Sequence, residues 1–266
     1  MRTLILLSLS LSITAPQASA QSLEEMMKKA MEGQQQGANG TGTGVTVEEN
    51  TAPFVPLGFT GSYRMEVHQF RNGVEEKESP TNVRMAFTDD RMAMAPEMTG
   101  KTGGSMRMVH DLKNKYTYTL TTDEKGKRTG MKMKMMKVKV DDVNKEDEKG
   151  SKVIRTDEMK VIDGHPCRKY TYSDEGGSGE AWIAEDVSFN PSKALASMMV
   201  DSRRSEQWQQ APFAGLMMET TWKDANGKDS TVMYTKDLVV GKVDEALFST
   251  AGYEMMDMSN YPMFGK

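Results

Sequence analysis

The sequence predicts a mainly β protein built around one antiparallel sheet. Apolar and polar residues alternate through most of residues 57–258, and this period of two is typical of strands with one buried face. Short turn-forming segments separate the alternating runs, which favours antiparallel neighbours. Within this part of the chain, helical spacing is clear only at residues 191–209. We therefore expect one β domain over residues 57–258, with one or two capping α-helices.

The expected strands follow one another closely along the chain. The first alternating run covers residues 59–67, and Asn72-Gly73 supplies a tight turn after it. Further strands are predicted around residues 83–87, 92–94, 106–110, 116–120, 169–172, 180–184, 216–223 and 230–240.

Two loops and one irregularity complete the predicted sheet. Residues 173–179 and the pair Asn226-Gly227 each separate two runs and predict hairpins. Residues 130–140 also alternate, but their period slips by one residue after Met135, which predicts a β-bulge.

Residues 1–20 have the layout of a secretory signal peptide. Arg2 precedes an apolar stretch at residues 4–13, and small residues end at Ala20. The apolar stretch is too short to span a bilayer, and no later stretch is long enough, so we expect no transmembrane segment. The expected location is periplasmic or secreted, after cleavage near Ala20.

Two segments lie between the signal peptide and the β domain. Residues 21–33 carry a capping-box pattern, Ser22 with Glu25, ahead of apolar residues at helical spacing, which predicts a short amphipathic helix. Residues 34–56 are rich in Gly, Gln and Thr and predict a flexible linker. Residues 259–266 form a tail after the domain.

Composition and motifs exclude several classes of function. The chain has 34 Lys+Arg against 38 Asp+Glu, a net charge of −4, which does not suit a nucleic-acid-binding protein. One cysteine excludes a disulfide framework and a cysteine-based zinc site. Nucleophile-elbow, zinc-protease and phosphate-loop motifs are absent from the sequence. We therefore expect a protein that is not an enzyme and needs no cofactor.

The single Cys167 follows His165 by two residues. We favour a packed small hydrophobe at this position, because free cysteine is among the most buried residue types. The alternatives are a thiol assisted by His165 and a disulfide between two chains, and the oligomeric state stays open.

Methionine is the compositional outlier, at 25 of 266 residues. Met-x-Met pairs on a strand place both thioethers on one face, where they can fill a core, form an adaptable surface for acyl chains, or bind Cu(I). The best metal candidate is Met106, Met108 and His110, which alternate on one strand, with Met92 and Met94 as further donors. Core filling is the interpretation that needs the fewest assumptions, since any half-buried strand alternates in this way.

Several short motifs resemble those of a bacterial secreted domain family of unknown function. They are DGHPCRKY at 163–170, EAWIAED at 180–186, MVHD at 108–111 before Tyr116, and VDEALF at 243–248 leading into AGYEMM at 251–256. Thr250-Ala251 stands where the family often has proline, and the resemblance covers residues 58–258. The family is similar to the periplasmic lipoprotein carrier LolA. That similarity implies a curved antiparallel sheet, an incomplete barrel with helices across its concave side, and a hydrophobic concavity for acyl chains. It implies no catalytic residues.

These observations lead to one hypothesis and two alternatives. We expect a LolA-like β domain that binds a lipid or lipoprotein acyl chain on a Met- and aromatic-lined concave face. The expected lining, which sequence alone cannot separate from the packed core, is Met65, Met85, Phe87, Met106, Met108, Tyr116, Tyr118, Trp182, Leu195, Met198 and Met199. The alternatives are a Cu(I)- or Ag(I)-binding protein and a purely structural envelope protein.

Overall fold

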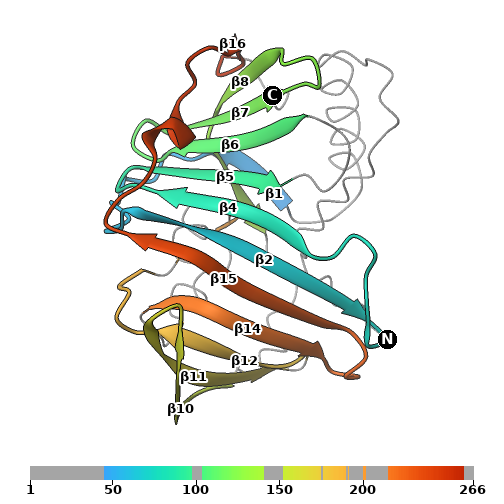
Figure 1. Cartoon of the computed structure of the whole chain (residues 1–266). Coiled ribbons are helices and arrows are strands. Elements are labelled where there is room, and N and C mark those ends of the chain that lie inside the picture. Colours follow the sequence, from blue (N-terminus) through green and yellow to red (C-terminus); the bar gives the residue numbers. More distant parts are fainter. Residues whose placement is uncertain are drawn as a thin grey trace. The chain divides into compact units, whose positions relative to one another are not determined.

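The chain divides into two compact units, Met1–Val45 and Thr46–Lys266, and the description below concerns the second. The computed structural model describes residues 45–97, 104–140, 152–174, 176–189, 191, 200–201 and 215–260 (Figure 1). The signal peptide and the 21–33 helix expected from the sequence lie outside the described residues, as does most of the 259–266 tail.

A single 13-stranded sheet dominates the described unit. In sheet order its strands are β10 (Lys152–Ile162), β11 (His165–Asp174), β12 (Gly177–Ala184), β14 (Leu216–Asp224), β15 (Ser230–Val240), β2 (Gly61–Arg71), β4 (Thr81–Phe87), β5 (Arg91–Glu97), β6 (Ser105–Asp111), β7 (Tyr116–Thr122), β8 (Arg128–Lys134) and β16 (Glu254–Asp257), with β3 (Val74–Glu75) paired to β2. All pairs are antiparallel except β8 with β16. The sheet is curved and does not close, which confirms the expected mainly β, half-barrel class (Figure 1).

Turn residues place the hairpins where the sequence predicts them. Asn72 and Gly73 both have positive φ, 51° and 76°, and join β2 to β3 in the geometry that asparagine and glycine tolerate. Gly227 lies between β14 and β15, and β11 ends at Asp174 before β12 begins at Gly177. The local turn chemistry therefore fixes the antiparallel order of these strands.

Three short strands form a second sheet, in the order β1 (Val45–Glu49), β9 (Met136–Val140) and β13 (Val200–Asp201). The period slip after Met135 is therefore a change of sheet and not a β-bulge. Met135 is buried, its N–H donates to the carbonyl of Lys115, and its carbonyl accepts from Asn50 N–H. A bulge and a change of sheet shift the period by the same one residue, so the sequence cannot separate them.

The second sheet also changes two expectations about local structure. β1 lies within residues 34–56, where we expected a linker, because its alternating Val-Thr-Val-Glu run has a strand partner in β9. β13 lies within residues 191–209, so a single helix through that whole range is wrong. Val200 pairs with Val138 in a parallel register, and this tertiary pairing outweighs the helical spacing around it. The rest of 192–209 lies outside the described residues.

Apart from residue 191, the described residues contain one helical segment, the 3-10 helix η1 (Glu245–Phe248). Asp244 caps it by accepting a hydrogen bond from Ala246 N–H. Phe248 packs on a small cluster that includes Val109 and Leu120, on one face of the sheet. The guanidinium of Arg107 donates to carbonyls at the end of η1, which holds this segment against the sheet.

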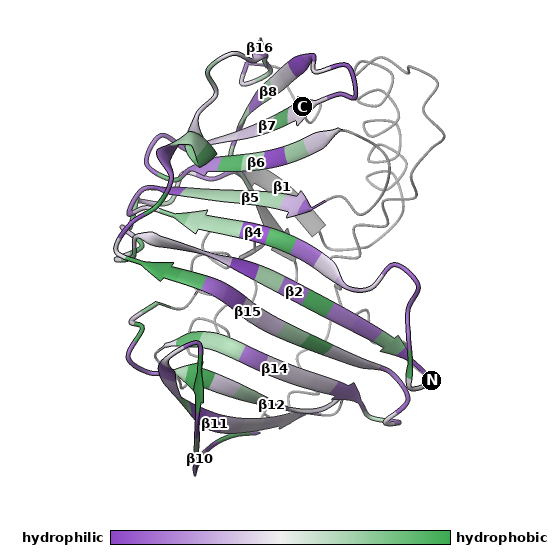
Figure 2. Ribbon diagram, in the orientation of Figure 1, coloured by the Kyte–Doolittle hydropathy of each residue, from purple (hydrophilic) through white to green (hydrophobic). Residues whose placement is uncertain are grey.

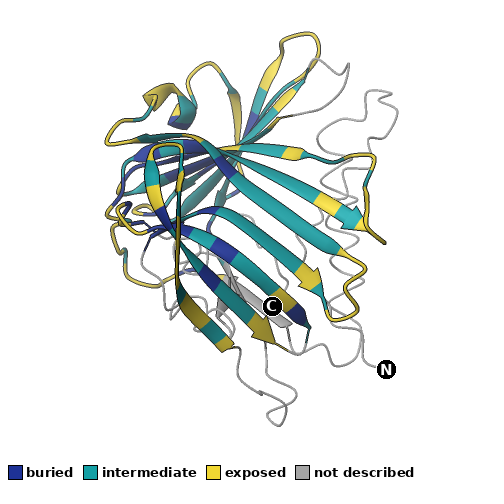
Figure 3. Cartoon of the chain, turned by 60° about the horizontal axis from the view of Figure 1, so that its bottom comes forward, coloured by how far each residue is buried: buried dark blue, intermediate teal, exposed yellow. Residues whose placement is uncertain are grey.

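The main core lies on the other face of the sheet, toward one end of the strands. It includes Phe59, Tyr63, Phe87, Leu216 and Met218. Hydropathy alternates along β2 and β4 as the period of two requires (Figure 2). Buried positions gather at one end of these strands and give way to half-buried and exposed ones toward the other (Figure 3).

Candidate functional site

Apolar side chains lie opposite one another on successive strands across one face of the large sheet. Directly opposed residues of antiparallel strands point to the same face, with Cβ atoms about 4.5–5.5 Å apart. One row across β2 to β8 consists of Tyr63, Met85, Met94, Met108, Thr119 and Met131. The next row consists of Gly61, Phe87, Met92, His110, Thr117 and Met133.

Burial falls along this face from the core outward. Phe87 and Met92 are fully buried and Met85 is 3% exposed, so all three belong to the packed core. Met65 and Met94 pack against that core but stay half-buried. Two of the residues expected to line a site, Met85 and Phe87, are thus core residues, and Met65 lies at the margin of the core.

On β2 to β8, six half-buried methionines lie on this face beyond the core, and we call them the methionine face: Met65, Met94, Met106, Met108, Met131 and Met133. Thr117, Thr119 and Thr121 of β7 lie between the methionines of β6 and those of β8. The register thus gathers polarizable thioethers and neutral hydroxyls. Such a surface can adapt its shape to an apolar ligand.

Tyr116 and Tyr118 lie on the opposite face, which corrects the expectation that they line the same surface. Met108 faces Thr119, so the threonines of β7 share the methionine face and the tyrosines point away from it. Tyr118 packs on the cluster under η1, and the ammonium of Lys132 lies 4.0 Å from the ring centroid of Tyr116. Alternation separates the residues of one strand into two faces. It does not show which of these faces is shared with a given residue of the neighbouring strand.

The remaining predicted lining residues fall elsewhere. Trp182 on β12 packs at the edge of the main core, with the ammonium of Lys160 4.3 Å from its ring centroid. Leu195, Met198 and Met199 lie outside the described residues. The three metal candidates share one face of β6, as the sequence predicts: Met106, Met108 and His110.

His110 is the imidazole that the register of β5 to β8 places on the methionine side. Its Nδ1 lies 3.0 Å from Thr117 Oγ1, and Met92 stands opposite it on β5. Burial lowers the pKa of His110 to about 4, because the apolar surroundings disfavour the charged ring. The ring is therefore neutral near pH 7.

A family comparison accounts for most of this unit. The model of the family described as "Domain of unknown function (DUF4412)" matches residues 59–253. The chain belongs to this family. The matched range contains all of the methionine face and the main part of the sheet, so the resemblance to a domain family of unknown function is confirmed. No curated protein matches the sequence.

Solved structures similar to the DUF4412 domain are distant. PNGF-II is 14% identical with a TM-score of 0.34, and the match covers 75% of this chain and 31% of that protein. An uncharacterized conserved protein from Thermus thermophilus is 7% identical, with coverages of 74% and 91% and a TM-score of 0.38. A putative outer membrane lipoprotein-sorting protein domain from Vibrio parahaemolyticus is 12% identical, with coverages of 84% and 97% and a TM-score of 0.20. At TM-scores this low, these likenesses establish neither fold nor function.

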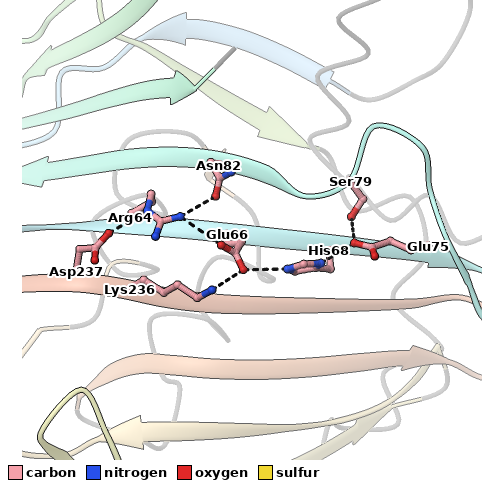
Figure 4. A network of polar contacts seen from close by, with 8 residues as sticks. All are labelled: Arg64, Glu66, His68, Glu75, Ser79, Asn82, Lys236 and Asp237. Carbon is pink, nitrogen blue, oxygen red and sulfur yellow. Dashed lines mark hydrogen bonds and ion pairs between the residues drawn. The ribbon is translucent and has the colours of Figure 1, made fainter. Parts of the chain in front are cut away.

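The opposite face of the DUF4412 domain carries a network of paired charges on β2 and its neighbours (Figure 4). Glu66 accepts from Lys236 Nζ at 2.7 Å and lies 3.0 Å from His68 Nε2. Glu75 lies 2.6 Å from the other ring nitrogen of His68. Arg64 donates to Asp237 at 2.9 Å. We call this set the ionic face: Arg64, Glu66, His68, Glu75, Ser79, Asn82, Lys236 and Asp237.

The charges of the ionic face shift each other's protonation. The hydrogen bond from Lys236, then that from His68, lowers the pKa of Glu66 to about 2. The hydrogen bond to Glu66 raises the pKa of His68, with Glu75 adding to the effect. The sequence analysis missed this set, because only the register brings Lys236 of β15 beside Glu66 of β2.

Cys167, His165 and a surface hollow are weaker candidates for a functional site in the DUF4412 domain. Cys167 is fully buried, and burial raises the pKa of its thiol, which fits a packing role. His165 instead pairs with Asp186 at 2.9 Å. An open hollow of about 620 Å³ lies at the β2–β3 hairpin, among charged side chains such as Glu76 and Lys77. Its lining is too polar to hold an acyl chain.

The described residues contain no group of three or more His, Cys, Asp or Glu side chains that could hold a metal ion. No helix among them is long and apolar enough to cross a membrane.

Proposed function

We propose that the protein acts outside the cytoplasm, in the periplasm or after secretion, and binds an acyl chain of a lipid or lipoprotein without catalysing a reaction. The observation that carries the proposal is the methionine face. Six half-buried thioethers extend from the core on one face of an open sheet. The signal-peptide pattern of residues 1–20 supports the location.

The dimensions of the methionine face suit an acyl chain. Four strands spaced about 4.8 Å apart give the half-buried part of the row, from Met94 on β5 to Met131 on β8, a length of roughly 14 Å along the sheet. The acyl chains of one leaflet occupy about half of a 30 Å hydrocarbon core, or roughly 15 Å. The threonines of β7 are neutral, so no described charge interrupts the row. Methionine side chains can also repack around chains of different length.

The first test is native mass spectrometry of the protein isolated gently from its own envelope or medium. We expect an adduct of several hundred daltons that extracts into organic solvent and whose fragments identify an acyl chain. A bare polypeptide mass, together with no binding of an added fluorescent fatty acid, would overturn the proposal and favour a structural envelope protein.

A matched pair of variants locates the site. Met94→Glu places a charge on the methionine face, whereas Ala95→Glu places the same charge on the next residue of β5, opposite Arg84 on the other face. We expect the first variant to lose fluorescent fatty acid binding and the second to keep it, because burying a carboxylate against an acyl chain is costly. Met94→Leu should bind normally, since leucine is close to methionine in volume. Equal fatty acid binding by Met94→Glu and Ala95→Glu would show that the binding site does not lie on this face.

A further inference from the structure

The β5–β6 pair brings two Met-x-Met segments and one histidine together on the methionine side of the sheet. Met94 is directly opposite Met108, and Met92 is directly opposite His110. Opposed Cβ atoms lie about 4.5–5.5 Å apart and diagonal ones about 7–8 Å apart, which flexible side chains can close around one ion. We call these four residues the soft-donor cluster: Met92, Met94, Met108 and His110.

The histidine of the cluster is oriented for coordination. Nδ1 of His110 lies 3.0 Å from Thr117 Oγ1. In the tautomer in which Nδ1–H donates to this hydroxyl, Nε2 carries the free lone pair, and the described residues offer Nε2 no hydrogen-bond partner. A hydrogen bond from the second ring nitrogen is the usual way in which proteins fix a metal-binding imidazole. Thr117 is therefore a positioning residue for His110.

The donor set selects a class of metal. Thioether sulfurs are soft ligands that favour Cu(I), and an imidazole nitrogen also suits copper. The residues opposite and beside the cluster on this face, such as Phe87 and Thr119, are neutral. The described residues offer an ion there no counter-charge, which penalises a divalent cation more than a monovalent one.

We propose that the soft-donor cluster binds one soft monovalent metal ion, Cu(I) or Ag(I), through His110 Nε2 and the thioethers of Met94 and Met108, with Met92 beside them. This site goes beyond acyl binding and does not depend on it. It also replaces a site drawn from β6 alone. Met106 and His110 are four residues apart on one strand, or about 13 Å, too far to share an ion easily.

Silver titration of protein labelled with ¹³C at the methionine methyl groups tests the site directly. Ag(I) is the probe because it has the same ligand preference and does not change oxidation state. We expect the methyl signals of Met92, Met94 and Met108 to shift and saturate at one equivalent, and those of Met65 and Met131 to stay in place. No shift, or shifts spread evenly over all methionines, would overturn the proposal.

Paired variants give a second measurement. Met94→Leu with Met108→Leu removes two sulfurs, whereas the control, Met131→Leu with Met133→Leu, removes two sulfurs from β8 on the same face. We expect the first pair to weaken Ag(I) and Cu(I) binding by about tenfold or more, equivalent to about 1.4 kcal/mol, and the control to have little effect. Equal weakening by both pairs would contradict the assignment. Fluorescent fatty acid binding, measured separately on the parent protein and on both variants, reports the proposed function, so a failure of metal binding and a failure of acyl binding are distinguishable.

Discussion

Two histidines on opposite faces of the sheet, His68 on β2 and His110 on β6, have surroundings of opposite kinds. On the ionic face, carboxylates on both sides of His68 raise its pKa. On the methionine side, apolar surroundings lower the pKa of His110 to about 4. Burial without a counter-charge and pairing with a carboxylate shift an imidazole in opposite directions.

The comparison indicates which face can accept a ligand. Every ionisable group drawn in Figure 4 already has a partner within the network, so binding there would have to break existing ion pairs. The methionine side chains of the methionine face are flexible and form no ion pairs, and their apolar contacts are not directional. An apolar chain or a soft metal ion can therefore bind it while the ionic face stays intact.

The largest expected effect on the free energy of unfolding comes from the buried core residue Phe87 on β4, compared with a residue on the opposite face of the same strand. Phe87 is fully buried and its ring centroid lies 4.7 Å from that of Phe189 and 5.7 Å from that of Tyr63. Phe87→Ala should lower the free energy of unfolding by about 3–5 kcal/mol, because it leaves a cavity in a packed aromatic cluster. Denaturant unfolding measures the change.

The control for this prediction lies three residues earlier on β4. Arg84 is exposed on the other face, and Arg84→Ala should change the free energy of unfolding by no more than about 0.5 kcal/mol. Similar losses in the two variants would mean that the core does not lie where the burial of β4 places it.

Much of the sheet could be predicted from the sequence, because strand periodicity and turn chemistry are local. Asn72-Gly73 and Gly227 sit in the turns that their backbone preferences require. The break after Met135 could not be read correctly, since it depends on β9 finding partners in β1 and β13, far away in sequence.

The sequence predicted the part of the candidate site that lies within one strand, but not the part that depends on the pairing of strands. Alternation places Met106, Met108 and His110 on one face of one strand, and the structure agrees. It cannot supply the register between strands, which brings Met94 to Met108 and sends Tyr118 to the opposite face. Nor can it separate a buried methionine such as Met92 from a half-buried one.

The next largest effect concerns His110 and the acid stability of the metal-free protein. Its pKa is lower in the folded state than the value of 6.5 usual for histidine, so the unfolded chain takes up the proton first as pH falls. Stability should decrease between pH 6.5 and about 4, on the order of 3 kcal/mol from this residue. Denaturant unfolding at several pH values should show a shallower acid slope for His110→Gln than for the parent protein. Identical slopes would mean that water or charge reaches the ring.

His68 should give a smaller effect of the opposite sign, because Glu75 is 40% exposed and solvent screens the pair. Its raised pKa means that its contribution is fully present below the unfolded pKa of about 6.5 and is lost as pH rises through the folded value. The stability difference between the parent protein and His68→Gln should therefore shrink from pH 6 to pH 8. A difference that grew over this range would contradict the pairing with Glu66 and Glu75.

The smallest effect tests whether the ionic face gains stability from individual pairs. Lys236 Nζ lies 2.7 Å from Glu66 Oε1, and the side chains are 41% and 13% exposed. A double-mutant cycle with Lys236→Gln and Glu66→Gln should give a coupling energy of about 0.5–1 kcal/mol, because a partly exposed ion pair is screened and costs side-chain entropy. The coupling should weaken as salt is raised, because dissolved ions shorten the Debye length and screen the attraction between the two charges. A coupling energy of several kcal/mol that did not change with salt concentration would show that Glu66 is effectively buried. The contrast between a solvated ionic face and a desolvated methionine face would then be wrong.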